Sequence, residues 1–256
     1  MSRFPTRDRA RFIPFIVAGD PNLKTTAALI LALSELQPMA IEVGVPFSDP
    51  TADGPTIQRS GQRALRNGTT LAAILEMLKR TRGEERAPIV LFGYYNPILQ
   101  FGLDQFVRAS AQSKVSGVLV VDLPAEAARS LQKKLQNKNI DLIFLVTPTT
   151  GDKRLKQIVR MASGFIYVVA RTGVTGTTRG LADESQQLVR RIRALTDLPV
   201  AVGFGITTGE QARRVCRYAD AAVVGSRLVQ EIEESRKLSS AQVVKRVLRL
   251  ARQCAA

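Results

Sequence analysis

The stretch Ile41-Glu42-Val43-Gly44-Val45 is an apolar, β-branched run with one glutamate in its middle. It leads directly into Pro46-Phe47-Ser48-Asp49-Pro50-Thr51-Ala52-Asp53-Gly54-Pro55-Thr56, a segment rich in proline, glycine and carboxylates. Continuous apolar runs are typical of strands that are covered on both faces, as in a parallel sheet. A strand of this kind that ends in a polar loop predicts an α/β fold with its functional groups at the strand ends.

Seven further apolar runs share this character and alternate with segments of helical periodicity. The eight predicted strands are residues 12–17, 40–45, 89–93, 117–123, 142–146, 165–169, 200–204 and 221–225. The predicted helices include residues 69–78, 104–112, 125–136 and 184–195. Eight strand-helix units in 256 residues indicate a single-domain (β/α)8 TIM barrel over residues 1–256.

A doubly wound open sheet is the alternative fold, because it shows the same alternation and differs only in closure. The phosphate-binding pattern G-x-G-x-x-G is missing after its first strand, where Val17 is followed by Ala18-Gly19-Asp20-Pro21. No linker, low-complexity segment or break in composition divides the chain. One domain is therefore the simplest interpretation.

Two connections are longer than the regular spacing requires. Residues 46–68 follow the second predicted strand, and residues 171–181 follow the sixth. Loops at the carboxyl ends of barrel strands build the active site, so we expect functional groups in both. The glycine- and threonine-rich loop 171–181 has the composition of a mobile lid, with an ordinary surface loop as the alternative.

The chain is strongly basic, with 37 lysines and arginines against 22 acidic residues. The cations are spread over helical segments of the last third, which favours a solvated outer helix surface over a nucleic-acid site. No stretch has the length of a membrane span, and the first residues lack the pattern of a secretory signal. With two cysteines at no disulfide or metal spacing, we expect a soluble, cytoplasmic protein that binds neither nucleic acid nor membrane.

The absence of histidine limits the groups that can transfer a proton near neutral pH. It also removes the usual ligands of zinc and most transition metals, so no metal site is predicted, with a carboxylate-bound Mg²⁺ as the alternative. On the strand around residue 42, Glu42 and Gly44 share the face opposite Ile41 and Val43, which sends the glutamate into the barrel. A desolvated carboxylate there acts as acid and base; the alternative is an ion pair with an inward lysine or arginine.

Asp49 and Asp53 stand in the loop that follows this strand. Taken singly, each is explained by turn chemistry, since aspartate accepts hydrogen bonds from nearby backbone N–H groups. Two aspartates and Ser48 crowded after an inward glutamate shift the interpretation towards function.

Glycines mark the ends of three consecutive predicted strands, at Gly176, at Gly205 and at Gly225 with Ser226. The loops after the seventh and eighth strands are the usual phosphate site of a TIM barrel. Glycine allows backbone N–H groups close to an anion, and Ser226 is placed to begin a helix aimed at it. Glycines that merely end strands are the alternative.

These residues resemble the tryptophan synthase α-subunit family over nearly the whole chain. The resemblance rests on Pro14-Phe15-Ile16, Ala18-Gly19-Asp20-Pro21, Glu42 to Pro50, Ala52 to Gln58, Tyr94-Tyr95-Asn96-Pro97-Ile98, Val121-Asp122-Leu123-Pro124, Gly173-Val174-Thr175-Gly176, Val202 to Ile206 and Gly225-Ser226. It implies a carbon–carbon lyase that cleaves indole-3-glycerol phosphate to indole and glyceraldehyde 3-phosphate.

The resemblance also implies roles for individual residues. Glu42 would protonate C3 of the indole and remove the glycerol hydroxyl proton, and Asp53 would accept a hydrogen bond from the indole N–H. The remaining positions it implies are Phe15, Tyr94, Tyr167 and Phe204 around the indole, Gly176, Gly205, Gly225 and Ser226 around the phosphate, and Thr175 in the closing loop.

In the family, the α subunit works with a β subunit in an α2β2 complex, and pyridoxal phosphate belongs to that partner. By resemblance, Asp49, Pro50 and residues 95–99 would lie at the interface, and no cofactor is expected in this chain. A free-standing lyase, or a weakly active barrel that binds and activates a β subunit, are the alternatives.

Thr51 and Ala170 depart from the leucine and serine that are common at these positions in the family. The segment before Phe12 is shorter than the helix that usually closes the barrel floor, which puts the stability of the floor in question.

Overall fold

Eight short, buried strands form the centre of the molecule, as their continuous apolar sequences require. They are β1 (Phe12–Val17), β2 (Ile41–Gly44), β3 (Ile89–Gly93), β4 (Val115–Val120), β5 (Asp141–Val146), β6 (Ile166–Val169), β7 (Val200–Gly203) and β8 (Ala221–Val224). Each strand pairs in parallel with the next, and β8 pairs with β1, so the sheet is a closed barrel. The predicted (β/α)8 fold is confirmed, and the open sheet is excluded.

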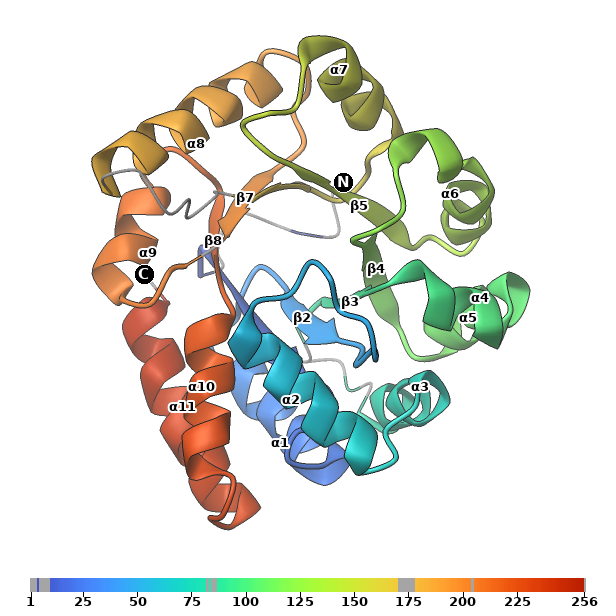
Figure 1. Ribbon diagram of the computed structural model, residues 1–256, viewed down its shortest axis with the longest axis vertical. Coiled ribbons are helices and arrows are strands. Elements are labelled where there is room, and N and C mark those ends of the chain that lie inside the picture. Colours follow the sequence, from blue (N-terminus) through green and yellow to red (C-terminus); the bar gives the residue numbers. More distant parts are fainter. Residues whose placement is uncertain are drawn as a thin grey trace.

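The computed structural model describes residues 4, 10–81, 83, 87–169, 178–203 and 205–255, and of residues 178–183 it describes the backbone alone. Helices surround the barrel (Figure 1). They are α1 (Leu23–Ser34), α2 (Pro55–Arg66), α3 (Leu71–Arg80), α4 (Tyr95–Phe101), α5 (Leu103–Gln112), the 3-10 turn η1 (Ala125–Ala127), α6 (Arg129–Gln136), α7 (Asp152–Met161), α8 (Thr178–Arg193), α9 (Gly209–Val215), α10 (Ser226–Ser235) and α11 (Ser240–Cys254).

Most predicted boundaries differ from the structure by one or two residues, and the helix predicted over residues 184–195 is α8, which begins earlier, at Thr178. The other larger differences are the following. The strand predicted over residues 117–123 is β4, which begins at Val115 and ends at Val120. The helix predicted over residues 125–136 is divided into η1 and α6. The long loop predicted over residues 46–68 contains α2, because Pro55 occupies the first turn of a helix, where its missing N–H costs nothing.

The barrel interior is filled by the inward side chains of alternate strand positions. This interior cluster includes Ile13, Val90, Leu119, Ile143, Phe165, Tyr167, Ala201 and Val223. The opposite strand faces pack against the helices in a second, larger cluster. The interior is therefore a packed core, and a functional group inside it is withdrawn from water.

Phe4 fills the floor of the barrel. It is fully buried, and its ring meets Phe165 edge to face with the ring centroids 5.2 Å apart. Gly117 and Gly164 leave room for it, since a Cβ at Gly117 would lie 3.1 Å from Phe4 Cζ, and one at Gly164 would lie 2.8 Å from Phe4 Cε2. Among the described residues before Ala10, Phe4 thus contributes an aromatic side chain to the floor of the barrel.

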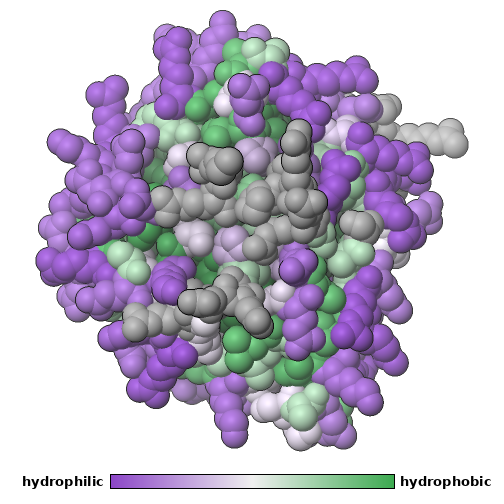
Figure 2. Space-filling view, turned by 180° about the vertical axis from the view of Figure 1, so that it is seen from behind, coloured by the Kyte–Doolittle hydropathy of each residue, from purple (hydrophilic) through white to green (hydrophobic). Residues whose placement is uncertain are grey.

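Hydrophilic side chains form the outer rim of the molecule, as the view from behind shows (Figure 2). Lys245 and Arg249 on α11 and Arg213 and Arg214 on α9 are all exposed. This agrees with a solvated outer helix surface for much of the positive charge. Among the helices of the described residues, none has both the length and the apolar character needed to cross a membrane.

Candidate active site

Glu42 lies inside the barrel on β2. Ile41 and Val43 pack on the helix side, and Glu42 points the other way, in register with Phe15 on β1 and Val90 on β3. It is fully buried, and neither of its carboxylate oxygens has a hydrogen-bond partner among the described residues. Burial raises the pKa of Glu42 to about 8. Among the described residues, Glu42 therefore forms no ion pair with an inward lysine or arginine, which was the alternative to a catalytic role.

Tyr167 on β6 shares the barrel interior with Glu42. Burial raises its pKa well above the ordinary value, and the nearby charge of Glu42 raises it further. The Tyr167 ring fits because position 203 on β7 is glycine, where a Cβ would lie 2.9 Å from Tyr167 Cζ. Glu42 and Tyr167, both expected at the site from the sequence, thus lie together in one buried layer of the barrel interior.

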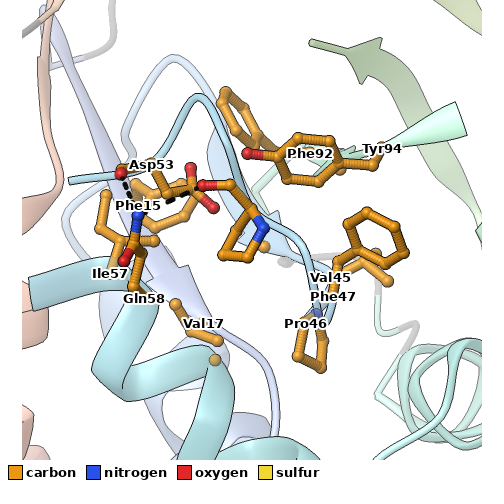
Figure 3. Close-up of a pocket in the computed structure, with 14 residues that line it drawn as sticks. Phe15, Val17, Val45, Pro46, Phe47, Asp53, Ile57, Gln58, Phe92 and Tyr94 are labelled. Atoms are coloured by element: carbon orange, nitrogen blue, oxygen red, sulfur yellow. Dashed lines mark hydrogen bonds between the residues drawn. The ribbon is translucent and has the colours of Figure 1, made fainter. Parts of the chain in front are cut away.

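A pocket opens above this layer at the carboxyl ends of β1, β2 and β3 (Figure 3). Gly44 lines the pocket, and Glu42 lies beneath it, two residues earlier on the same face of β2. The lining residues are Phe15, Val17, Gly44, Val45, Pro46, Phe47, Pro50, Asp53, Ile57, Gln58, Gly61, Phe92, Gly93 and Tyr94. The walls are largely apolar and aromatic, with Asp53 as the one carboxylate among them.

The Phe15 ring lies close to both Gly44 on β2 and Gly225 after β8. A Cβ at Gly44 would lie 2.8 Å from Phe15 Cζ, and one at Gly225 would lie 3.3 Å from Phe15 Cδ1. The Phe92 ring meets Phe15 edge to face at 5.2 Å. Gly44 and Gly225 therefore both make room for one aromatic ring, a packing role that the sequence did not indicate.

Asp53 faces Tyr94 across the pocket, from the loop between β2 and α2 (Figure 3). Burial raises the pKa of Asp53 to about 6, and a hydrogen bond from the Tyr94 hydroxyl opposes this shift. The Ala52 N–H donates to the same hydroxyl oxygen over 3.0 Å, and Phe47 packs on the Tyr94 ring at 5.1 Å. Asp53 thus interacts with a residue of another βα unit, whereas Asp49 binds its neighbour Ser48 within the turn.

Helix α2 holds this loop in place. The Gln58 side chain donates to the Asp53 carbonyl over 2.9 Å. Further along α2, Arg63 forms two hydrogen bonds with the buried Asp20, of 3.0 Å and 2.6 Å, and a third of 2.8 Å with Glu233 on α10. Ser60 also donates to Asp20. The helix behind Asp53 is therefore anchored to the loop after β1 and to the helix after β8.

We expect Arg63→Met to lower the free energy of unfolding by about 3 kcal/mol, because it leaves the Asp20 carboxylate buried without its cation. Urea unfolding measures the change. Arg59→Met is the matched control, since Arg59 is half exposed and, among the described residues, binds only Glu233 and Thr56. It should cost less than about 1 kcal/mol. Equal losses in the two variants would contradict the role of the buried pair.

The phosphate-site residues predicted from the sequence follow two neighbouring strands. Gly205 comes after β7 with φ of 70°, a conformation that favours glycine. Gly225 precedes α10 as its N-cap residue, and Ser226 is the first residue of that helix. Since β7 and β8 are adjacent, both glycines lie at the same edge of the barrel. Thr175, Gly176 and Phe204 lie outside the described residues.

Three residues of this arrangement were not singled out from the sequence. Phe92 and Gln58 line the pocket, and Arg63 anchors α2. The inward position of Phe92 follows from strand alternation with Val90, a signal that was available. Gln58 and Arg63 carry no such signal, because their partners are set by the path of the chain. No group of three histidine, cysteine or acidic side chains among the described residues is placed to hold a metal ion.

Comparison with known proteins gives a consistent result. A family model described as tryptophan synthase alpha chain matches residues 1–256. The tryptophan synthase alpha chain of Citrifermentans bemidjiense is 49% identical over 228 residues, which cover 89% of this chain and 85% of the relative. That of Gluconacetobacter diazotrophicus is 50% identical over 90% of this chain and 84% of its own.

Solved structures agree with these relatives. A chain of the tryptophan synthase α2β2 complex from Pyrococcus furiosus, described in terms of mutual activation, superposes with a TM-score of 0.87 at 38% identity, over 95% of this chain and 97% of that one. A chain of the aminoacrylate-bound tryptophan synthase of M. tuberculosis gives a TM-score of 0.87 at 32% identity, over 100% and 99%.

Proposed function

The chain belongs to the tryptophan synthase alpha chain family, whose members cleave indole-3-glycerol phosphate, and we propose that Glu42 and Asp53 carry this reaction here. One observation carries the proposal: a fully buried glutamate without a partner among the described residues lies directly beneath a pocket that presents a second carboxylate. The two groups differ in environment, as acid–base chemistry by two carboxylates requires.

Glu42 acts as acid and then as base. With a pKa of about 8 it holds a proton at neutral pH and donates it to C3 of the indole. The bond between C3 and the glycerol chain then breaks, and its electron pair remains with the ring. The carboxylate takes up the proton of the glycerol hydroxyl, whose oxygen becomes the aldehyde of glyceraldehyde 3-phosphate. Glu42 thereby regains its starting state.

Asp53 stabilises the positive charge that develops on the protonated ring. Its carboxylate accepts the indole N–H, while Tyr94 fixes its orientation through the hydrogen bond described above. Phe15, Tyr94, Tyr167 and Phe204 surround the indole in this proposal. Gly176, Gly205, Gly225 and Ser226 bind the phosphate, supported by the position of Ser226 at the start of α10, and Thr175 closes over the site.

The dependence of kcat/KM on pH should be bell-shaped. Activity requires Asp53 ionised, so it rises as pH passes about 6, and it requires Glu42 protonated, so it falls as pH passes about 8. Tyr94→Phe should move the acid limb to higher pH, because it removes the hydrogen bond that lowers the pKa of Asp53.

The phosphate of the substrate also changes its protonation at about pH 6. This contributes equally to the pH profiles of wild type and Tyr94→Phe. A pH–rate series for wild type and Tyr94→Phe therefore isolates Asp53. An acid limb that stays in place in the variant would contradict its assignment to Asp53.

The proposed partner is a tryptophan synthase β subunit in an α2β2 complex, bound through Asp49, Pro50 and residues 95–99. Asp49 is exposed, and Leu99 is 47% exposed despite its apolar side chain, which supports a contact surface there. Pyridoxal phosphate belongs to the partner, and no cofactor is assigned to this chain. The free thiols of Cys216 and Cys254 suit the reducing cytoplasm as the place of action.

The experiment that tests this function is indole release from indole-3-glycerol phosphate by the purified chain, alone and with a β subunit from the same cell. Slow release that the partner stimulates strongly is the expected result. Fast release without stimulation would instead identify a free-standing lyase. No indole release in either assay would refute the roles of Glu42 and Asp53 and leave binding of a β subunit as the function.

A further inference from the structure

A surface groove runs between α6 and α7 on the outer side of the barrel, with a volume of about 650 Å³. Figure 1 shows these two helices side by side on the outer ring, away from α2 and the pocket beside it. The Gln132 side chain on α6 donates a hydrogen bond of 2.6 Å to the Met161 carbonyl at the end of α7. This contact ties the helices together and gives the groove a fixed shape.

Five cations line the groove, namely Arg129 and Lys133 on α6 and Lys153, Lys156 and Arg160 on α7. Within the described ranges, none of the five takes part in an ion pair. Two of the carboxylates near these helices are bound elsewhere, and Glu126 in η1 is the exposed acidic residue before α6. Asp152 accepts from Arg191 over 2.7 Å, and Asp104 accepts from Lys134 on the far side of α6 over 2.5 Å. The groove therefore keeps an uncompensated positive charge.

The spacing of the cations defines the kind of anion that fits. Lys153, Lys156 and Arg160 follow each other at i, i+3 and i+7, one face of a helix that extends over about 10 Å. That is too long for a single phosphate or carboxylate. It matches acidic side chains that repeat at helical spacing on a second helix.

The surface between the cations is apolar. Met161 is half buried in the groove, and the methylene stems of the lysines and arginines add apolar surface beside it. None of the described residues that line the groove is aromatic, so they form no platform on which bases of a single-stranded nucleic acid stack. A second copy of this chain offers no matching segment among the described residues, because Glu231 and Glu233 of its most acidic helix are already paired with arginines.

We propose that the groove between α6 and α7 binds an acidic, amphipathic helical segment of another protein. Carboxylates of the segment pair with the five cations, and its apolar residues contact Met161 and the lysine stems. The association is electrostatically steered, and it weakens as salt rises.

The test is fluorescence anisotropy with a labelled helical peptide in which glutamates at i, i+3 and i+7 alternate with leucines. The peptide should bind at low salt, and a counterpart with lysine in place of glutamate should not. Lys133→Glu with Lys156→Glu should weaken binding by about tenfold or more. The matched control is Lys237→Glu with Lys245→Glu, which makes the same change in net charge at exposed positions on α11 and before it.

Three outcomes would overturn the proposal: no binding of the acidic peptide at low salt, equal loss in the groove variant and the control, or tighter binding of duplex DNA that competes with the peptide. Equal loss of peptide affinity in the two double variants would mean that the peptide responds to the net charge of +15 as a whole and not to the groove. Indole release should be unchanged in both double variants. The result of the peptide-binding test therefore does not depend on the test of the lyase function.

Discussion

Glu42→Gln is expected to lower the rate of indole release by about 10²- to 10⁴-fold while the barrel remains folded. Glutamine has nearly the same shape, but it neither donates an acidic proton to C3 nor accepts the hydroxyl proton. The loss should appear in kcat, because Glu42 lies beneath the pocket and does not line it. Single-turnover assays measure the chemical step, and calorimetric titration with substrate measures binding. Retained activity would refute Glu42 as the acid–base group.

The stability of Glu42→Gln, measured at different pH values, distinguishes a loss of catalysis from a loss of folding. Wild-type Glu42 keeps its proton in the folded state up to about pH 8, while the unfolded chain loses it near the ordinary value of 4.5. The unfolded state then binds fewer protons, so wild-type stability falls as pH rises from 4.5 to about 8. Glu42→Gln should show a smaller decline in urea unfolding between pH 5 and pH 8, because only the contribution of Asp53, which ends at about pH 6, remains.

Asp53→Asn is expected to reduce turnover by about 10²- to 10³-fold. The amide keeps the size of the side chain and still accepts a hydrogen bond from Tyr94, but it has no negative charge to stabilise the protonated ring. Steady-state kinetics of the chain without its partner measure the effect. Asp49→Asn is the control, because Asp49 is exposed and binds only Ser48 in its own turn among the described contacts. Comparable losses in the two variants would mean that Asp53 only shapes its loop.

The position of Glu42 could be predicted from the sequence because strand alternation is a local rule. Apolar neighbours at 41 and 43 suit the helix side, and this sends residue 42 inward whatever the rest of the chain does. Whether the glutamate meets a cation there depends on side chains from other strands. Only the structure shows that its oxygens have no hydrogen-bond partner among the described residues.

The helix α2 was missed for a related reason. Pro55 and Gly54 are turn signals and are also the residues that begin a helix, so the local pattern admits both structures. The anchoring of α2 could not be predicted at all, since Arg63 is 43 residues from Asp20 and 170 from Glu233. The assignments of Thr175, Gly176 and Phe204 stay predictions, because these residues lie outside the described part of the chain.

The arginine that joins Asp20 to Glu233 also sets the order in which the molecule can be completed. Its second partner lies in α10, after all eight strands have been synthesised. A growing chain that has passed residue 66 already contains α2 and Asp53, but it lacks one of the two anchors that hold them. The anchoring of this pocket wall is therefore complete only after α10 has been synthesised. The helix behind Asp53 is thus joined both to the loop after the first strand and to the helix after the last, a contact of long sequence separation of the kind that slows folding.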